Sequence, residues 1–305
     1  MTRILCAMLL VVSLAAAQAR EENVITVNVD LVNIYFTVCN KKGRLIPDLG
    51  RESFTVFEDD NRQTITNFSR ETDLPLTIVL LIDTSGSVRY KLSFEQDAAI
   101  DFLQSTLRRG RDKAALYTFD STVDLRQDYT DDLQLLAHAV KRTHSGGGTA
   151  LYHALDFLLE GTLARQEGRR GIVLLTDGDD NSSRSSPREV VEAAQRNNVA
   201  IYAISVNSLD IRSGDSERAD DVLKLFAGET GGNAFFPRQP KQLSRYFKKI
   251  SNELSSQYTI AYRSTNPKRD GTFRRIRIEV NDTHYAARSR SGYYAPGGIA
   301  TARSE

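Results

Sequence analysis

The sequence has few of the residues that carry thiol or zinc chemistry. Its 305 residues include two cysteines, four histidines and no tryptophan. Two cysteines cannot build a disulfide framework, and the four histidines show none of the spacings of a zinc site. The absence of tryptophan removes one common anchor for sugar or interface recognition. These shortages argue against a disulfide scaffold, a zinc centre and thiol-based cofactor chemistry.

An excess of charge of either sign is also lacking. The chain has 40 Lys and Arg against 39 Asp and Glu, so its formal net charge is +1. Such a balance creates no global field that attracts nucleic acid or an anionic membrane. We therefore predict no nucleic-acid partner, and any charged partner must be recognised locally. With 40% hydrophobic residues, the chain is otherwise typical of one large or two modest globular domains.

The N-terminus carries an apolar run. Within residues 1–19, Arg3 precedes this run, and small residues surround a bond that can be cleaved after Ala19. We interpret residues 1–19 as a secretory signal peptide, because the run is shorter than a bilayer-spanning helix. The next apolar stretch, Leu74–Ile82, suits a buried strand. We therefore expect a secreted or periplasmic protein with no transmembrane segment after signal cleavage.

Both flanks of the chain have the alternating pattern of β-strands. About four strands are expected before residue 70, and strand patterns return after residue 256. The expected strands are Val24–Val29, Ile34–Val38, Phe54–Phe57, Thr64–Thr66, Tyr258–Tyr262, Phe273–Val280, Tyr285–Arg288 and Gly292–Tyr294. The C-terminal strands are too few to be independently secure, but with the four at the N-terminus they can complete one β-sandwich. The predicted segments are N-terminal strands over 20–72, C-terminal strands over 257–297 and a tail over 298–305.

The centre of the chain alternates between strand and helix patterns, which is typical of a parallel or mixed sheet covered by helices. The expected strands are Leu76–Ile82, Ala114–Phe119, Thr122–Arg126, Gly171–Leu175, Val199–Val206 and Asn233–Phe236. The expected helices are Lys91–Leu107, Asp131–Arg142, Ala150–Ala164, Pro187–Asn197, Ala219–Gly228 and Lys241–Leu254. This α/β segment would be inserted between the two halves of the sandwich.

Oxygen-bearing side chains gather in three loops of the α/β segment. The loops are Asp83-Thr84-Ser85-Gly86-Ser87, Gly146-Gly147-Gly148-Thr149 and Thr176-Asp177-Gly178-Asp179-Asp180. The first and third loops directly follow predicted strands, and the second opens a predicted helix. Open α/β folds bind ligands at the carboxyl edge of the sheet. We therefore expect the three loops to meet at that edge.

The chemistry of these loops suits a hard divalent cation. An oxygen-only set with few protein ligands favours Mg²⁺ over a dedicated Ca²⁺ cage, with Mn²⁺ or Ca²⁺ as alternatives. Ser85, Ser87 and Thr149 are neutral ligands, so the charge of the metal is offset mainly by Asp83 and Asp177. The cation would stay electrophilic, and a carboxylate from a protein partner could take an open position.

The order of these residues resembles the metal-ion-dependent adhesion site (MIDAS) of the von Willebrand factor type A family, written DxSxS, then Thr, then Asp. Asp83, Ser85, Ser87, Thr149 and Asp177 match all five positions. The resemblance covers residues 73–256. It implies a doubly wound, mostly parallel, Rossmann-like sheet with helices on both faces, and metal-dependent protein binding. The flanking strands and N-terminus resemble those of secreted bacterial proteins related to this family.

Enzymatic and nucleotide-binding interpretations fit less well. No GxxxxGK[ST] or GxGxxG motif surrounds Gly146–Gly148. A hydrolase nucleophile elbow needs Gly where Asp83 stands, and an aspartyl phosphatase would need a carboxylate where Ser85 stands. No complete catalytic set remains. We therefore predict that the protein is not an enzyme.

Structural interpretations of the same residues also exist. Serine and threonine are favoured at helix starts, and we expect Asp179 and Asp180 only to shape a turn. An EF-hand starting at Asp177 fails, because Ser182 stands where Gly is needed and Arg188 where Glu is needed.

The C-terminal strands are rich in basic residues, and the expected role of these residues is a solvated sheet face, with a weak anion-binding face as the alternative. The residues are Arg263, Lys268, Arg269, Arg274, Arg275, Arg277, Arg288 and Arg290.

Two functions remain. The first is a secreted or periplasmic binding module whose Mg²⁺ coordinates an acidic residue of a protein partner. The second is a structural or assembly component of the cell envelope, in which the metal only stabilises the core. The sequence does not specify the partner or the oligomeric state.

Overall fold

The computed structural model describes residues 31–70, 74–86, 92–206 and 214–297. Four predicted features lie outside these residues: the signal peptide, the strand Val24–Val29, the ligand Ser87 and the tail. No helix in the described part of the chain is long and apolar enough to cross a membrane.

A six-stranded sheet forms the centre of the α/β segment. Its strand order is β10-β9-β8-β5-β6-β7. All neighbours are parallel except β6 and β7, which are antiparallel. The strands are β5 (Leu76–Asp83), β6 (Lys113–Phe119), β7 (Val123–Thr130), β8 (Arg169–Thr176), β9 (Val199–Ser205) and β10 (Ala234–Phe235). Every residue of β5 is buried, as expected for a parallel strand covered on both faces.

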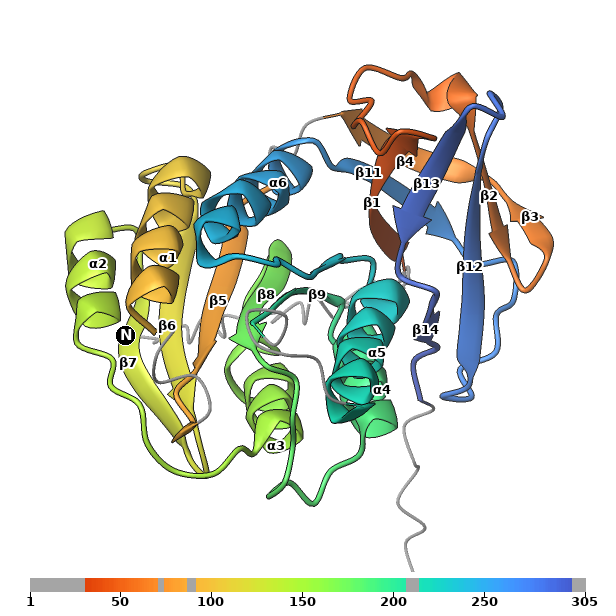
Figure 1. Cartoon of the computed structure of the whole chain (residues 1–305). Coiled ribbons are helices and arrows are strands. Elements are labelled where there is room, and N and C mark those ends of the chain that lie inside the picture. Colours follow the sequence, from red (N-terminus) through yellow and green to blue (C-terminus); the bar gives the residue numbers. More distant parts are fainter. Residues whose placement is uncertain (1–30, 71–73, 87–91, 207–213, 298–305) are drawn as a thin grey trace, which may run out of the picture. The chain divides into compact units, whose positions relative to one another are not determined.

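Helices cover both faces of this sheet (Figure 1). One face packs against α1 (Leu92–Thr106), α2 (Leu133–Lys141) and α6 (Leu243–Ser255). The other packs against α3 (Leu151–Asp156), α4 (Pro187–Arg196) and α5 (Gly214–Thr230). Alternate residues of β5 enter the two cores, because successive side chains of a strand point to opposite faces. The predicted doubly wound fold is confirmed.

The predicted helices are all present, with two differences. Helix α5 begins at Gly214 rather than at Ala219. The helix predicted over Ala150–Ala164 is α-helical only to Asp156, and a π-helical segment follows over Phe157–Thr162.

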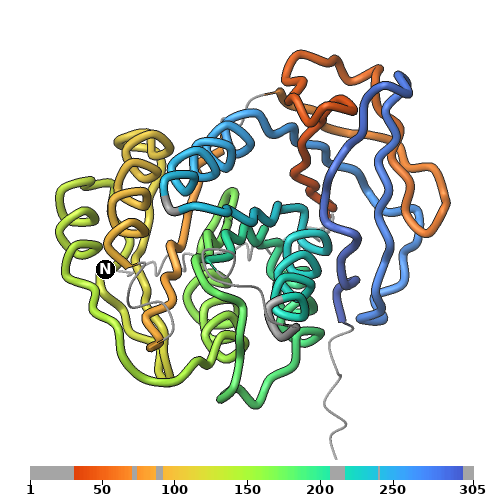
Figure 2. The backbone as a smooth tube through the Cα atoms, viewed as in Figure 1, coloured from red at the N-terminus to blue at the C-terminus, as the bar shows by residue number. Residues whose placement is uncertain are grey.

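The flanking strands form two four-stranded antiparallel sheets, and each combines strands from both ends of the chain, as Figure 2 shows. In the first, of order β13-β1-β11-β4, the strands are β1 (Leu31–Asn40), β4 (Ile65–Arg70), β11 (Tyr258–Arg263) and β13 (Tyr285–Ser289). In the second, of order β14-β12-β2-β3, they are β2 (Phe54–Glu58), β3 (Asn61–Gln63), β12 (Phe273–Val280) and β14 (Gly292–Tyr294). The predicted sandwich is therefore confirmed.

Aromatic rings hold the two sheets of the sandwich together. Phe36 of β1 and Tyr258 of β11 belong to one sheet, and Phe54 of β2 belongs to the other. The Phe54 ring centroid lies 5.1 Å from that of Phe36 and 5.3 Å from that of Tyr258. Both pairs are edge-to-face, which adds to the gain from burying the rings.

One of the basic residues in the C-terminal strands is buried inside the sandwich, contrary to the predicted solvated face. Arg274 is only 2% exposed. Its guanidinium lies 4.0 Å from the Glu58 carboxylate and 3.2 Å from that of Asp270. Glu58 also accepts hydrogen bonds from the hydroxyls of Tyr262 and Tyr293 at 2.8 and 2.9 Å. This network compensates the buried charge, which would otherwise be costly.

A second basic residue, Arg290, joins the sandwich to the α/β segment. It is 8% exposed and lies between β13 and β14. Its Nη1 donates to the backbone oxygen of Gln195 in α4 at 3.0 Å, and its Nη2 donates to that of Asn33 in β1 at 3.0 Å. The solvated-face prediction is wrong for this residue too, because the α/β segment covers it.

The packing of α1 on α6 gives a stability prediction. Phe102 is 1% exposed, and its ring lies 5.0 Å from that of Phe247, whereas Phe94 in the same helix is 53% exposed. Phe102→Ala should lower the free energy of unfolding by roughly 3–5 kcal/mol. Phe94→Ala should change it by less than about 0.5 kcal/mol. Urea denaturation of both variants measures the difference, and equal losses would contradict this packing.

Candidate functional site

The candidate site lies at the carboxyl edge of the α/β sheet. Asp83 is the last residue of β5, and Asp177 directly follows Thr176, the last residue of the neighbouring strand β8. From β5 the sheet continues to β6 on one side and to β8 on the other. The site therefore lies at the point where the strand order reverses, which is the usual ligand crevice of open α/β sheets.

Backbone hydrogen bonds connect the first loop to the glycine-rich loop. Gly146 donates its N–H to the Thr84 oxygen at 2.7 Å, and Gly86 donates to the Gly147 oxygen at 3.3 Å. Gly147 has a φ of +88°, a conformation that glycine adopts without strain. A Cβ atom there would lie 2.7 Å from an oxygen of Asp120. Glycine thus permits the glycine-rich loop to approach Asp120, which follows β6.

The third loop is bonded to both of the others. Thr149 donates its N–H to the Asn181 side-chain oxygen at 3.1 Å, and the Asn181 N–H donates to the Thr149 oxygen at 3.0 Å. The Thr176 hydroxyl donates to Asp83 Oδ2 at 2.6 Å. The structure thus brings Asp83, Thr149 and Asp177 onto interlinked loops.

Four of the five predicted ligands are described, and all four are buried: Asp83, Ser85, Thr149 and Asp177. Ser87, the fifth, lies outside the described residues. Asp83 Oδ1 accepts the N–H of Ser85 at 2.8 Å. This bond and the one from Thr176 hold the Asp83 carboxylate in a fixed orientation.

Two neighbouring carboxylates give the site its electrostatic character. Burial, and after it the negative charge of Asp177, raise the pKa of Asp83, while hydrogen bonds from Ser85 and Thr176 lower it; the net pKa is about 6. A cation between the loops would relieve both the desolvation and the repulsion. Among the described residues, no group of three or more His, Cys, Asp or Glu side chains is placed to hold a metal. A site here must therefore use hydroxyl oxygens beside its two carboxylates, and such a set fits a hard cation.

Sequence patterns missed two residues that hold the loops in place. Thr176 donates to Asp83 and also accepts the N–H of Gly178 at 3.0 Å. Asn181 bonds to Thr149 through both its side chain and its backbone. Their sequence context gives no sign of these roles, because the bonds from Thr176 to Asp83 and between Asn181 and Thr149 join loops that are distant in the sequence. Asp180 accepts the N–H of Tyr152 at 2.9 Å at the start of α3, which extends its predicted role beyond shaping a turn.

An open hollow of about 380 Å³ borders the third loop and α5. It is lined by Tyr152, Gly178, Asp179, Asp180, Asn181, Arg218, Ala219 and Val222. It provides space next to the candidate metal ligands at the sheet edge.

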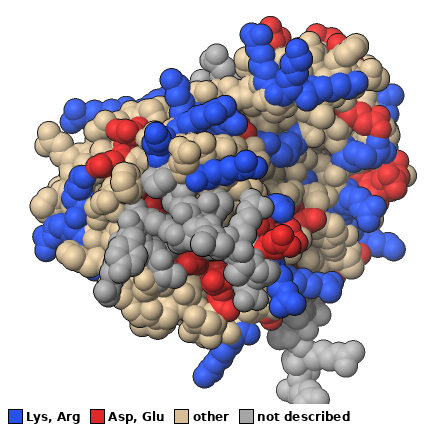
Figure 3. Space-filling model, in the orientation of Figure 1, with Lys and Arg blue, Asp and Glu red and all other residues tan. Residues whose placement is uncertain are grey.

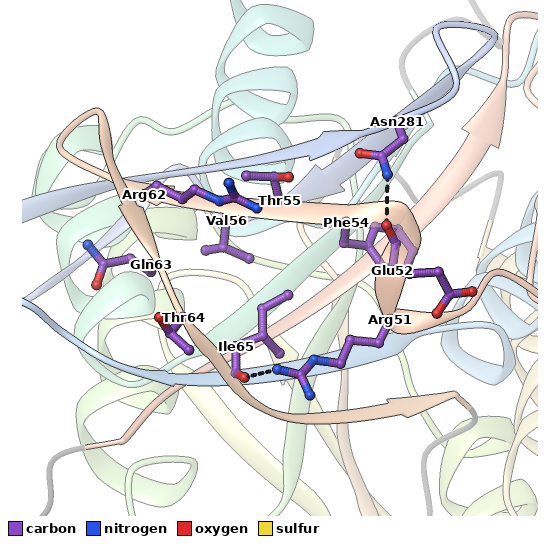
Figure 4. Close-up of a pocket in the computed structure, with 10 residues that line it drawn as sticks. All are labelled: Arg51, Glu52, Phe54, Thr55, Val56, Arg62, Gln63, Thr64, Ile65 and Asn281. Atoms are coloured by element: carbon purple, nitrogen blue, oxygen red, sulfur yellow. Dashed lines mark hydrogen bonds between the residues drawn. The ribbon is translucent and has the colours of Figure 1, made fainter.

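A second open hollow, of about 720 Å³, lies in the sandwich where the chain passes from β3 to β4 (Figure 4). Arg51 reaches the backbone oxygen of Ile65, and Asn281 reaches that of Glu52 at 2.7 Å. None of the candidate metal ligands lines this hollow.

Charge on the visible surface is mixed. Figure 3 shows Lys and Arg side chains with Asp and Glu side chains among them on the face it presents. This agrees with the balanced composition of the chain.

Comparison with known sequences identifies the central segment. The model of the von Willebrand factor type A domain family matches residues 77–249. Calcium-activated chloride channel regulator 1 from Bos taurus is 26% identical over 243 residues, which are 76% of this chain and 25% of that protein. An uncharacterized protein of Borreliella burgdorferi is 25% identical over 221 residues, which are 67% of this chain and 62% of that protein. The chain thus spans less than two thirds of the length of these relatives.

Solved structures share the fold. A von Willebrand factor type A protein from Catenulispora acidiphila has a TM-score of 0.52 and 14% identity, over 88% of this chain and 74% of that chain. Proximal thread matrix protein 1 from the mussel byssus, with a zinc-occupied MIDAS motif, has a TM-score of 0.51 and 17% identity, over 65% of this chain and 49% of that chain.

The raised pKa of Asp83 predicts how pH affects the metal-free protein. The folded chain holds this proton more tightly than the unfolded chain, where the pKa is near 3.9. Protonation of Asp83 therefore stabilises the folded chain fully below about pH 4, and this contribution is lost as the pH rises through about 6. This loss amounts to about 3 kcal/mol.

Denaturation in EDTA at pH 4 to 7 measures this effect. The loss of stability should be absent in Asp83→Asn and present in Asp179→Asn, which changes an exposed carboxylate of the third loop. Parallel pH profiles for the wild type and Asp83→Asn would contradict the assignment.

Proposed function

The chain belongs to the von Willebrand factor type A domain family, and from this premise we propose that it is a binding module in which Mg²⁺ recruits an acidic side chain of a protein partner. Domains of this family typically bind protein ligands and are usually not catalytic. The observation that carries the proposal is the pair of buried carboxylates, Asp83 and Asp177, on loops that also present Ser85 and Thr149.

In this proposal the side chains of the site bind the metal ion. Asp83, Ser85, Ser87, Thr149 and Asp177 would hold the ion, some directly and some through water. When bound, the ion supplies an electrophilic position that an oxygen of the partner can occupy. Three of these five side chains are neutral hydroxyls, so the protein does not quench the positive charge fully. The zinc-occupied MIDAS motif of proximal thread matrix protein 1 supports a divalent cation on this fold.

The surroundings of the site suit an acidic partner. The hollow beside the third loop is open, and the exposed Arg218 on its α5 side adds a positive charge. A partner side chain entering there meets the sheet edge beside Asp177. The expected partner is therefore a protein that presents an exposed Asp or Glu.

We also propose that the protein works outside the cytoplasm, secreted or in the periplasm, after removal of residues 1–19. The basis is the apolar run that ends in small residues. Mass spectrometry of the protein from its native host should find a mature N-terminus at Arg20. Recovery of the uncleaved chain from the cytoplasm would contradict this assignment.

Metal binding is tested by calorimetry of the metal-free protein with Mg²⁺. The wild type should bind one ion, and the double variant Asp83→Asn with Asp177→Asn should lose binding, because only neutral ligands remain. Asp179→Asn is the matched control and should bind like the wild type. Binding that is unchanged in the double variant would refute the proposed ligand set.

Capture of partners separates adhesion from a purely structural role of the metal. Immobilised wild-type protein should retain an envelope protein in Mg²⁺ and release it in EDTA, and Asp177→Asn should retain none. The structural role would be favoured instead if the metal raised the melting temperature and capture was the same in Mg²⁺ and EDTA.

A further inference from the structure

Three arginines surround a small hollow where the α/β sheet meets the sandwich. Arg169 and Arg170 begin β8, and Arg290 comes from the sandwich. They line a hollow of about 20 Å³ together with Tyr35 of β1 and Gln257, among others. The hollow lies at the amino end of β8, whereas the candidate metal site lies at the carboxyl end of the same strand. The two sites are therefore separate.

The buried arginines of this cluster have only neutral acceptors. Arg169, 2% exposed, donates to the Leu254 oxygen at 2.7 Å and to the Gln257 side-chain oxygen at 3.1 Å. Arg290 donates only to backbone oxygens, as described above. Arg170 donates to the backbone oxygen of Leu163 at 3.2 Å. Within the described residues, no carboxylate forms an ion pair with any of the three.

Other arginines with little exposure in this chain have carboxylates close to their guanidinium groups. Arg274 has the carboxylates of Glu58 and Asp270 near it. The half-buried Arg288 pairs with the Glu253 carboxylate. The cluster around the small hollow thus lacks a direct ion pair, and the Asp112 carboxylate acts on Arg169 only from beyond ion-pair distance. A buried charge without compensation costs several kcal/mol per ion.

Unsatisfied donors also occur in this cluster, as they do at Arg274 and Arg288 elsewhere in the described part of the chain. The Nε atoms of Arg169, Arg170 and Arg290 are buried, and none has a hydrogen-bond partner in the described part of the chain. Burial lowers the pKa of Arg169 and of Arg290 to about 10, so both remain charged at neutral pH. Burial raises the pKa of Tyr35, so its phenol stays neutral and cannot supply the missing charge.

The size of the hollow limits its occupant. One water-sized particle needs about 10–15 Å³, so the available 20 Å³ admits one small particle and excludes phosphate or a carboxylate ligand. Water could accept the free N–H groups, but it would leave the positive charges uncompensated. We propose that the hollow binds a chloride ion, which bridges the arginines of β8 to Arg290 and so fastens the α/β sheet to the sandwich.

Thermal unfolding in different salts tests the proposal, with EDTA present so that the metal site does not contribute. At matched ionic strength, chloride and bromide should raise the melting temperature with increasing concentration, because a ligand of the folded state stabilises it. Gluconate is too large for the hollow and should not do so. Equal melting temperatures in chloride and gluconate would overturn the proposal.

Variants exclude a general salt effect. Arg170→Met removes one charge and a single hydrogen bond from a half-buried position. It should raise the chloride concentration of half-maximal stabilisation at least tenfold. Arg245→Met, which removes an exposed arginine from α6, should leave that concentration unchanged. The same chloride response in the wild type and Arg170→Met would overturn the assignment.

Crystals grown in bromide decide the matter even if Arg170→Met does not fold. An anomalous peak in the hollow of the wild type, between Arg169, Arg170 and Arg290, is the expected result. Density that fits water only, without anomalous signal, would refute the anion.

Discussion

Repulsion between two buried carboxylates is the constraint on which the candidate site depends. Asp83 ends a strand that is buried along its whole length, and Asp177 follows the neighbouring strand. The parallel sheet thus places two carboxylates in one crevice, where burial and the charge of Asp177 oppose the ionisation of Asp83. The interlinked loops prevent the two carboxylates from moving apart. A cation between the loops is therefore the direct way to compensate their repulsion. Binding energy and fold stability are therefore coupled at this edge.

The two ends of β8 collect opposite charges. Its carboxyl end leads into Asp177 and the acidic crevice, and its amino end carries Arg169 and Arg170 beside the sandwich. Arg290 completes the basic end from the sandwich and bonds to α4. The sandwich is built from both ends of the chain, so the α/β segment is attached to it by two connections and by this polar junction. An ion at each end of one strand would compensate both sets of charges.

Much of the fold was predictable, because the hydrophobic patterns that define its strands and helices are local in the sequence. The apolar run ending in Asp83 predicted a buried central strand, and β5 matches it. Alternation predicted the strands of the sandwich except β3 (Asn61–Gln63), and the small number of C-terminal strands predicted that the two flanks combine. The burial of Arg274 and Arg290 was not predictable, because a period of two residues assigns a side chain to a face without telling what covers that face. The roles of Thr176 and Asn181 also depend on loops that meet only in the folded chain.

The convergence of three loops on one cation is tested most directly by Mn²⁺ as a paramagnetic probe in NMR spectra. Substoichiometric Mn²⁺ should first broaden the amide resonances of Gly86, Gly147 and Gly178, one from each loop. The exposed acidic turn at Asp59 and Asp60 serves as an internal reference and should broaden only at higher concentration. Broadening that is equal at the turn and the three loops, or that persists at the loops in Asp83→Asn with Asp177→Asn, would contradict a shared metal site.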